Sequence, residues 1–265
     1  MTTILITGST DGIGLAAAES LASLGHDVVL HGRNPDKADR AVEQVRAGAR
    51  GEVASVVADL SELRGVAAFT DRVLSDHPDL GVVINNAGVF TTDREMTAEG
   101  LDVRFAVNTI APYVIATRTL PHLPADGRLV NLSSAAQQPV DLGALGSGPG
   151  LGHQAAYAQS KLALTMWSIE LGLASDGPTV IAVNPGSLLG TKMVQDGYGV
   201  AGGDIGIGAD ILTRSAVDPT MADANGQYFD NDIGRLAHPH PDALDPAKRR
   251  ALIERIDEIV AGLTT

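Results

Sequence analysis

The sequence predicts an α/β protein built on a doubly wound parallel sheet with helices on both faces. Short runs of β-branched residues alternate with longer helical patterns over the first two thirds of the chain. The first of these runs leads directly into a glycine-rich turn and then into a helical stretch. With 265 residues, 44% of them hydrophobic, and no linker or repeat, the chain is expected to form a single domain over residues 1–265.

The individual elements follow from the hydrophobic pattern and from turn residues at its breaks. The expected strands are Thr3 to Thr7, Asp27 to His31, Val53 to Ala58, Gly81 to Asn85, Arg128 to Leu132 and Thr179 to Val183. The expected helices are roughly Ile13 to Leu24, Pro35 to Ala47, Leu63 to Asp76, Arg94 to Leu120 and Gln154 to Ala174. A late strand, Gln227 to Asp230, is expected to close the sheet. The last helix should begin at Asp245 and Pro246, an N-cap residue followed by proline at the first helical position.

Two segments are too rich in glycine for regular elements to be expected. Five glycines lie between Leu142 and His153, and seven lie between Ser187 and Asp210. Both segments follow strands at the carboxyl edge of the sheet, where open α/β folds bind their ligands. We interpret residues 142–153 and 187–210 as substrate lids, with ordinary surface loops as the alternative.

Composition excludes several classes of function. The chain carries 19 Lys and Arg against 32 Asp and Glu, a net charge of −13, so neither nucleic acid nor a membrane surface is an expected partner. It contains no cysteine, which excludes disulfides and thiolate chemistry. Without a basic leader or a long apolar stretch, a cytoplasmic location is expected. No metal site is expected, because His238-Pro239-His240 lacks further ligands nearby.

The first turn has the properties of a phosphate cradle. The strand Thr3 to Thr7 leads into Gly8-Ser9-Thr10-Asp11-Gly12-Ile13-Gly14, and helix-forming residues follow. Glycines here allow a tight bend and a close approach to a pyrophosphate, which the free amides at the helix N-terminus stabilise. The turn therefore predicts a dinucleotide-binding sheet of the Rossmann type, with contacts from Gly8, Ser9, Thr10, Gly12, Ile13 and Gly14.

The segment from Thr7 to Gly14 resembles the TGxxxGxG motif of non-extended members of the short-chain dehydrogenase/reductase family. Further matches follow in the family's order up to about Met193: Asp59-Leu60, Asn85-Asn86-Ala87-Gly88, Asn108, Asn131-Leu132-Ser133-Ser134, Tyr157-Ala158-Gln159-Ser160-Lys161 and Asn184-Pro185-Gly186. The resemblance implies cofactor contacts from Asp59, Leu60, Asn86, Ala87, Gly88, Tyr157, Lys161, Pro185, Gly186 and Thr191, although Thr191 lies one residue late. It also implies a homodimer or homotetramer through the helix that carries Tyr157.

The end of the second strand indicates which cofactor is used. An acidic residue there would bind the 2′-hydroxyl of NAD, but this chain has Gly32 followed by Arg33. A guanidinium can bind a 2′-phosphate bidentately, so NADP(H) is favoured over NAD(H). The alternative is that Arg33 only caps a turn.

Tyr157 and Lys161 are four residues apart in a helical stretch and so share one face. A neighbouring ammonium lowers the pKa of a tyrosine, and together with a positive nicotinamide it can bring that pKa towards about 7, where tyrosine serves as general acid or base. Ser133-Ser134 follow the fifth strand, and a hydroxyl there can bond the substrate oxygen. The resemblance implies that Ser134 is the catalytic serine and that Asn108 completes the catalytic group.

The expected function is therefore NADP(H)-dependent hydride transfer to or from a carbonyl or alcohol carbon of a small-molecule substrate. Tyr157 follows Ser134 by 23 residues, a long interval similar to that of the retinol dehydrogenase and protochlorophyllide reductase branch. A loop of this length beside the site could cover a bulky apolar substrate, and the alternative is that it has no role in the reaction. Two alternatives remain open. One is reduction of a carbon–carbon double bond on the same scaffold, and the other is a non-catalytic NADP(H)-binding regulator.

Overall fold

The computed structural model describes residues 1–148 and 150–263. Its centre is one eight-stranded sheet in the order β3-β2-β1-β4-β5-β6-β7-β8. All neighbouring strands are parallel except β7 and β8. The strands are β1 (Thr3–Ile6), β2 (Asp27–Gly32), β3 (Val53–Val57), β4 (Leu80–Asn85), β5 (Arg128–Leu132), β6 (Thr179–Asn184), β7 (Gln227–Asp230) and β8 (Arg235–Ala237). The predicted α/β fold class is confirmed.

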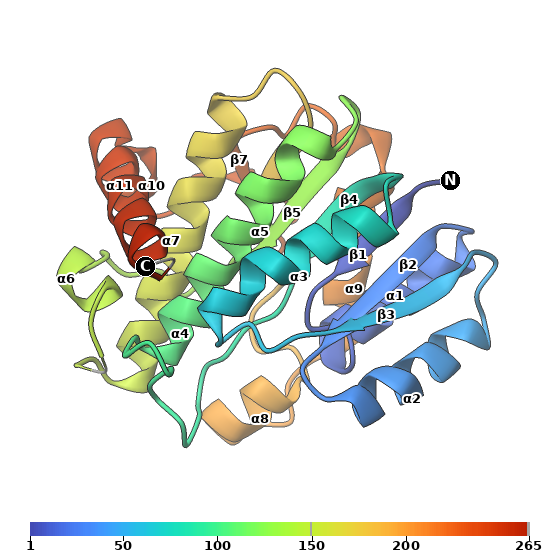
Figure 1. Cartoon of the computed structure of the whole chain (residues 1–265), viewed down its shortest axis with the longest axis horizontal. Helices are drawn as coiled ribbons and strands as arrows, with labels where there is room; N and C mark the ends of the chain where they lie inside the picture. The colour runs from blue at the N-terminus through green and yellow to red at the C-terminus, as the bar shows by residue number, and fades with distance from the viewer. Residues whose placement is uncertain (149, 264–265) are drawn as a thin grey trace.

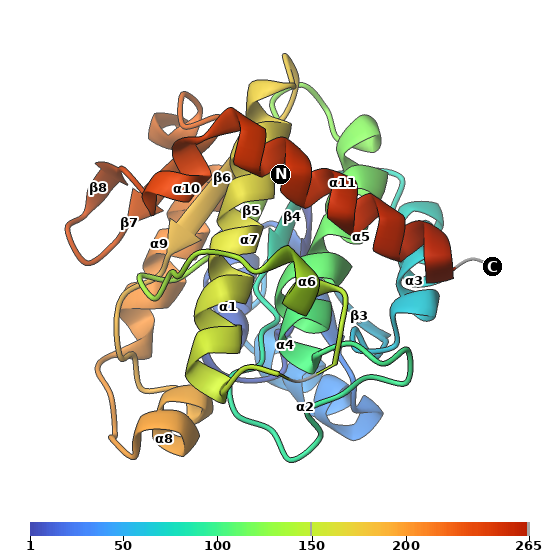
Figure 2. The ribbon, with the colours of Figure 1, turned by 90° about the vertical axis from the view of Figure 1, so that its left-hand side faces the viewer.

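Helices cover both faces of this sheet (Figure 1). One layer consists of α1 (Gly12–Ser23), α2 (Pro35–Arg46) and α9 (Ile205–Val217), and the other of α3 (Leu63–Asp76), α5 (Ala111–Thr119) and α7 (His153–Leu173). The second layer is itself crossed by the C-terminal helix α11 (Pro246–Leu263), as Figure 2 shows. Because helices bury both faces, the central strands are buried along their whole length and mostly apolar rather than alternating.

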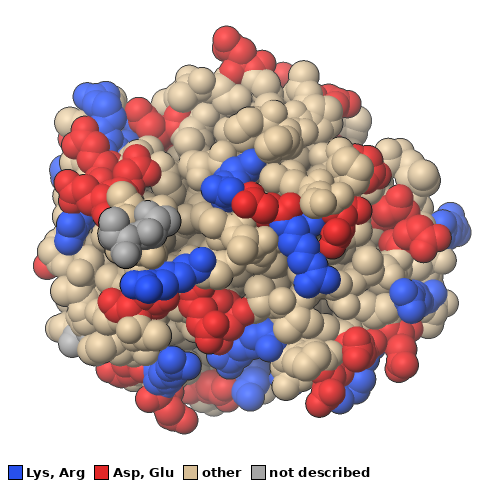
Figure 3. Space-filling view, in the orientation of Figure 1, with Lys and Arg blue, Asp and Glu red and all other residues tan. Residues whose placement is uncertain are grey.

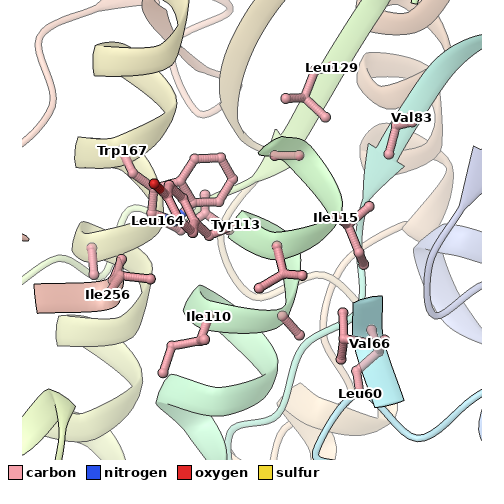
Figure 4. Packing of buried hydrophobic residues seen from close by; sticks show 14 of the residues in the cluster. Leu60, Val66, Val83, Ile110, Tyr113, Ile115, Leu129, Leu164, Trp167 and Ile256 are labelled. Atoms are coloured by element: carbon pink, nitrogen blue, oxygen red, sulfur yellow. The ribbon is translucent and has the colours of Figure 1, made fainter. Parts of the chain in front are cut away.

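The larger of two hydrophobic clusters lies between the sheet and α3, α5 and α7 (Figure 4). Val83 and Leu129 contribute from the strands, and Trp167 from α7 packs edge-to-face on Tyr113 with ring centroids 5.8 Å apart. Ile256 of α11 is fully buried in the same cluster. Each such side chain stabilises the fold by roughly 1.5–3 kcal/mol on burial. The cluster therefore fixes α7, which carries Tyr157, against the sheet.

Strand order reverses at β1, which has β2 on one side and β4 on the other. The connections after β1 and β4 therefore diverge to opposite faces and leave a crevice at the carboxyl edge, the usual ligand site of such sheets. The glycine turn follows β1 at this edge, and Asn86-Ala87-Gly88 follow β4. The fold thus brings these two predicted segments together.

The expected helix from Arg94 to Leu120 is wrong in its first third. Gly100 has φ +82°, which a right-handed helix cannot contain, and the helical path begins only at α4 (Val103–Phe105), which Asp102 caps. A π-helix (Ala106–Ile110) follows, and then α5 and a 3₁₀ turn (Leu120–His122). Residues 94–102 instead form a loop closed by a bridge between Met96 and Asp102.

The two glycine-rich segments contain more helix than their composition predicts. The segment 142–153 begins with α6 (Leu142–Leu145), which Asp141 caps, while Pro149 within it lies outside the described residues. The segment 187–210 holds α8 (Lys192–Tyr198) and the start of α9. Capping side chains explain this, since they satisfy the free amides of a first turn whatever residues follow.

The C-terminal part also holds elements that the sequence analysis did not predict. The sheet does not end at β7, because β8 adds an antiparallel edge strand. A 3₁₀ turn (Pro219–Met221) precedes β7, and α10 (Pro241–Leu244) leads into α11. Within the described ranges, no helix has the length and apolar character needed to cross a membrane.

Candidate functional site

The glycine turn after β1 is packed so closely that side chains are excluded. A Cβ atom on Gly14 would lie 2.4 Å from Asn86 Nδ2, and one on Gly8 would lie 2.8 Å from Ala87 Cα. Gly8 also has φ +64°, a conformation that favours glycine. The turn therefore lies directly against the segment after β4, and its backbone forms one wall of the crevice.

Hydrogen bonds hold these two segments together. Asn86 Nδ2 donates to the carbonyl oxygens of Thr7 and Gly8, at 2.9 and 2.8 Å. The Thr7 hydroxyl in turn accepts from the backbone amides of Asn86 and Ala87, at 3.0 and 3.1 Å. Asn86 and Ala87 thus position the turn, as well as lying where a cofactor would pass.

At the end of β2, Arg33 is exposed, and no carboxylate in the described part of the chain lies within ion-pair distance of it. Gly32 beside it is buried against Thr10, whose Cγ2 would be 2.5 Å from a Cβ at position 32. Asp59, after β3, accepts hydrogen bonds from Ser61 through Oδ1, at 2.9 and 2.7 Å. The guanidinium is therefore available to a ligand, whereas one carboxylate oxygen of Asp59 is already bonded.

Tyr157, Lys161 and Ser134 meet at the carboxyl ends of β4 and β5. Lys161 is buried, its Nζ lies 5.8 Å from the centroid of the Tyr157 ring, and it donates to the carbonyl oxygen of Leu132 at 2.6 Å. The Ser134 side chain hydrogen-bonds Tyr157. Ser133 points the other way and bonds the Thr165 hydroxyl at 2.6 Å within the core. Only the second serine of the pair is therefore directed at the tyrosine.

Burial shifts the pKa of both Tyr157 and Lys161. It raises the pKa of Tyr157 to about 12, although the Ser134 hydrogen bond lowers that pKa and Tyr198 raises it again. It lowers the pKa of Lys161 to about 8. The expected depression of the tyrosine pKa therefore does not arise from Lys161 alone, because the ammonium donates to a carbonyl rather than to the phenol. In the chain without ligand, Tyr157 holds its proton at neutral pH.

Asn108 lies in the π-helix and joins three parts of the site. Its side chain accepts from the amide of Val89 at 2.7 Å and donates to the carbonyl of Val89 and the hydroxyl of Ser160, both at 2.9 Å. A Cβ on Gly88 would lie 3.5 Å from Asn108 Oδ1 and 3.6 Å from Lys161 Nζ. Asn108 therefore makes long-range contacts instead of bonding within its own helix, and Gly88 leaves space beside the lysine.

Pro185 and Gly186 follow β6 at the same edge, where residues after β7 hold them. Asp232 accepts from the amide and hydroxyl of Ser187, at 2.7 and 2.6 Å, and from Asn184 at 2.9 Å. Asn231 Nδ2 donates to the carbonyl of Pro185 at 2.9 Å. Although burial raises the pKa of Asp232, these hydrogen bonds lower it below its ordinary value. The sequence analysis missed both residues, although two polar side chains directly after the strand Gln227 to Asp230 were a usable signal.

Helix α8 lies across the crevice between the glycine turn and the tyrosine. Its N-cap, Thr191, has Cγ2 3.7 Å from the Cβ position of Gly12, and Met193 Cε is 3.6 Å from that of Gly88. At its other end Tyr198 stacks on Phe90 with centroids 5.2 Å apart, and Phe90 meets the Tyr157 ring edge-on at 5.0 Å. Phe90, Met193 and Tyr198 were not predicted, since their importance depends on a helix that the glycine content concealed.

These residues fit a dinucleotide. A Cβ on Gly8 or Gly14 would collide with Ala87 or Asn86, so only glycines allow the turn to lie this close to the segment after β4. The exposed cation Arg33 lies at one end of the crevice, and Gly88 leaves space beside Lys161 at the other. Tyr157 and Ser134 then lie at the end where a nicotinamide ring would be presented to a substrate.

Comparison with known proteins decides the family. A family model described as short chain dehydrogenase matches residues 2–198. The chain belongs to the short-chain dehydrogenase family. This short-chain dehydrogenase is thus an oxidoreductase of a family that uses a nicotinamide cofactor, and its similarity to retinol dehydrogenases confirms the predicted branch.

Three curated relatives illustrate this similarity. Human retinol dehydrogenase 13 is 29% identical over 269 residues, which cover 93% of this chain and 81% of that protein. Mouse retinol dehydrogenase 12 is 33% identical over 205 residues, covering 74% of this chain and 64% of the relative. Human polyprenol dehydrogenase is 33% identical over 195 residues, covering 69% and 59% respectively. The last two matches span less than two thirds of those relatives.

Solved structures share the architecture. An uncharacterized protein from Mycobacterium paratuberculosis superposes with a TM-score of 0.80 at 25% identity, covering 98% of this chain and 94% of that one. A short chain dehydrogenase from Burkholderia cenocepacia in complex with NADP gives a TM-score of 0.70 at 29% identity, covering 87% and 96%.

Proposed function

We propose that this protein is an NADP(H)-dependent oxidoreductase that interconverts a carbonyl compound and the corresponding alcohol, with Tyr157 as general acid and base. The observation that carries the proposal is the meeting of Tyr157, Ser134 and Lys161 at the sheet edge beside the glycine turn. A regulator that only bound the cofactor would need the turn but not this group.

The proposed mechanism assigns one task to each side chain. The bound cofactor supplies or accepts the hydride. In reduction, the Tyr157 hydroxyl donates its proton to the substrate oxygen, and Ser134 donates a hydrogen bond to the same oxygen as charge develops on it. Lys161 binds the nicotinamide ribose, and its positive charge favours the phenolate that remains. Asn108 fixes the segment Gly88-Val89 beside that ribose.

An apolar substrate is favoured by the surroundings of the tyrosine. Phe90 contacts the Tyr157 ring and Tyr198 of α8 stacks on Phe90, while Met193 of the same helix lies beside Gly88. Such side chains gain free energy by removing apolar surface from water and offer few hydrogen bonds to a polar ligand. The relatives named for retinol and polyprenol are consistent with this class.

Substitution of the tyrosine tests the proposal. Tyr157→Phe removes only the hydroxyl, so NADPH should still bind while turnover of a carbonyl substrate, found by screening aldehydes, ketones and alcohols, falls about 10²- to 10⁴-fold. Tyr113→Phe is the matched control, because Tyr113 lies under α11 and bonds Asp257. Near-normal kcat in Tyr157→Phe would refute the assignment.

The serine pair offers an internal comparison of the same kind. Ser134→Ala should lower kcat with little loss of stability, because this serine faces the tyrosine. Ser133→Ala removes a buried hydrogen bond to Thr165 and should lower stability instead. The opposite pattern would show that the first serine serves the reaction.

Preference for NADP(H) rests on Arg33, which is exposed, unpaired among the described residues and placed at the end of β2. Two solved neighbours are NADP complexes, which supports the same choice. A bidentate, charge-assisted contact with the 2′-phosphate is worth about 1.5–3 kcal/mol, or roughly 10- to 150-fold in affinity. Wild-type protein should therefore bind NADPH at least about tenfold more tightly than NADH.

Calorimetric titration of Arg33→Ala tests this preference. NADPH affinity should fall by the same factor while NADH affinity stays nearly constant, since the two cofactors differ only at the 2′ position. Arg50→Ala, just before β3 at the opposite edge of the sheet, is the control and should leave both affinities unchanged. A Gly32→Asp exchange is unsuitable, because its Cβ would collide with Thr10. Equal losses of NADH and NADPH affinity in Arg33→Ala would refute the proposed preference for NADP(H).

A further inference from the structure

A buried histidine, which the proposed mechanism does not use, lies at the end of β2 immediately before Gly32 and Arg33. His31 is only 3% exposed. Its ring packs against that of Phe69, with the two centroids 5.1 Å apart. A buried imidazole at this position has to satisfy both of its ring nitrogens within the protein.

Both nitrogens have partners, and together these define the state of the ring. The backbone amide of Gly8 lies 3.1 Å from Nδ1, and the carbonyl oxygen of Ala58 lies 3.1 Å from Nε2. Because an amide can only donate, Nδ1 is the acceptor, and the single ring proton sits on Nε2 and is donated to Ala58. Burial lowers the pKa of His31 to about 4, so the ring is neutral at physiological pH.

The contacts of His31 reach two neighbouring strand ends. Gly8 begins the phosphate turn after β1, and Ala58 immediately precedes Asp59 after β3. The backbone adds two further bonds to the turn, because Ser9 N donates to the His31 carbonyl and His31 N donates to Ser9 Oγ, both at 2.9 Å. One residue thus connects the turn, the strand end before Arg33 and the segment before Asp59.

The hydrogen bond from the Gly8 amide to His31 Nδ1 matters most for the phosphate turn. Gly8 is held at φ +64° against Ala87, and its N–H is directed at the buried His31 ring rather than at the crevice. Without an acceptor there, a buried donor would be left unsatisfied, and the turn would relax to regain a hydrogen bond. The rest of the turn would hold the pyrophosphate of the proposed cofactor and lies next to the end of β2, where Arg33 would hold the 2′-phosphate, so such a relaxation would alter the binding of both groups.

We propose that His31 is a positioning residue for the adenosine half of the cofactor, acting through its Nδ1 acceptor for Gly8 and its Nε2 donor to Ala58. The inference rests on the proposed function, because it concerns the NADP(H) site. Through these two hydrogen bonds, the His31 side chain aligns the phosphate turn with Arg33 and Asp59. Tyr157, Lys161 and Ser134 lie at the other end of the site and do not contact it.

Three substitutions separate the two hydrogen bonds. His31→Asn keeps an acceptor near the Nδ1 position and loses the donor to Ala58. His31→Gln places its amide nearer the Nε2 position, so it keeps the bond to Ala58 and loses the acceptor for Gly8. His31→Leu loses both at similar volume. Calorimetry with 2′,5′-ADP, which carries only the adenosine half, and with NADPH measures the effect of each.

We expect His31→Leu and His31→Gln to bind 2′,5′-ADP at least about tenfold more weakly than wild type, the loss typical of an unsatisfied buried donor. His31→Asn should stay within about threefold of wild type. Because the nicotinamide end is untouched, kcat at saturating NADPH should be unchanged in all three, so the defect appears in KM for NADPH alone.

Thermal unfolding of each variant shows whether a loss of affinity comes only from loss of stability. All affinities are compared at a temperature well below the lowest Tm. Should His31→Leu fail to fold, the comparison of Asn with Gln still decides. Equal affinities in those two variants, or losses of affinity that follow Tm rather than the Gly8 acceptor, would overturn the inference. Failure of wild-type protein to bind either nucleotide would instead overturn the proposed function.

Discussion

Lys161 is a buried ammonium that donates to the carbonyl oxygen of Leu132, with no carboxylate of the described chain paired to it. Burial disfavours its charged form and lowers its pKa to about 8. Below that pH the side chain is charged and can bind the nicotinamide ribose. As the pH rises through about 8, the neutral form takes over and the positive charge beside Tyr157 is lost.

We therefore expect kcat/KM for NADPH, which reports on the free enzyme, to be level below about pH 8 and to fall up to tenfold per pH unit above it. Lys161→Arg, whose guanidinium keeps its charge, is the control and should lack this fall even if its rate is lower throughout. A pH profile with the same inflection in Lys161→Arg would show that another group is responsible.

Single residues were predictable where a motif fixes them and unpredictable where tertiary contacts decide. Tyr157, Lys161 and Ser134 were predicted from their spacing and the family resemblance, and the structure brings them together. The raised pKa of Tyr157 was not predicted, because it depends on burial beneath Phe90 and Tyr198. His31 reads in sequence only as the last residue of a strand.

Among the elements, α8 and α6 differ in how firmly they are held. None of the residues of α8 is buried, and its contact with the rest of the site depends on Met193 and on the stacking of Tyr198 on Phe90. In α6, by contrast, Leu145 is fully buried and the carbonyl of Leu142 accepts from Arg255 of α11 at 3.4 Å. Of the two predicted lids, α8 should therefore be displaced at the lower cost in free energy, because it has no buried residue.

Hydrogen exchange tests this difference. Met193 lies beside Gly88, where the proposed cofactor would pass, so binding of NADPH should alter the exchange of amides 192–198 while amides 142–146 stay unchanged. Gly197→Ala would bring a Cβ within 2.2 Å of the Phe90 ring and should speed exchange in α8 without any ligand. Identical exchange in α8 with and without NADPH would contradict its role as a lid.

The path from residue 94 to α5 shows why element boundaries were harder to predict than element types. The helical pattern expected from Arg94 to Leu120 was correct beyond Asp102, but it carried no sign of the π-helix at Ala106–Ile110. That distortion accompanies the bonds of Asn108 to Val89 and Ser160, which are distant in sequence. The local sequence pattern therefore predicts the helix, whereas its π-helical part accompanies long-range contacts of Asn108 that the pattern does not reveal.

Across the whole molecule, α11 covers the outer face of α5 and α7 (Figure 2). Leu252 and Ile256 are fully buried there, Asp257 accepts from the Tyr113 hydroxyl at 2.9 Å, and Arg249 bonds Glu170 at 2.6 Å. The family resemblance implies a dimer or tetramer contact through α7, and α11 packs against this same helix. On the surface in view, acidic and basic side chains are interspersed and neither sign forms a continuous patch (Figure 3).

The C-terminal helix should therefore contribute to global stability. Ile256→Ala removes a fully buried side chain and should lower the free energy of unfolding by about 2–5 kcal/mol. Ile253→Ala, on the same helix but only partly buried, is the control and should cost clearly less. Urea unfolding followed by the fluorescence of Trp167, the single tryptophan, measures both. Equal costs would show that α11 is not packed on this core.

The sheet and its flanking helices were predictable over most of the chain because a buried parallel sheet imposes β-branched runs at regular intervals. After about residue 187 the strand Gln227 to Asp230 and the last helix were predicted correctly. The elements α8, β8 and α10 were missed, because they are short and depend on caps and neighbours rather than on periodicity. Asn231 and Asp232, which bond Pro185 and Ser187 at the carboxyl end of β6, lie in this part. The glycine turn was therefore predictable from the sequence. The helix α8 and the contacts of Asn231 and Asp232 were not.

In the proposed reaction, hydride reaches a carbonyl carbon and Tyr157 supplies the proton to its oxygen. Reduction of an α,β-unsaturated aldehyde with NADPH that carries deuterium at the transferring C4 position tests this reaction, because mass spectrometry and NMR locate the deuterium in the product. We expect an allylic alcohol with deuterium on the carbinol carbon, formed by wild type and lost in Tyr157→Phe. A saturated aldehyde with deuterium at the β carbon would contradict it, since the enzyme would then be reducing the carbon–carbon double bond.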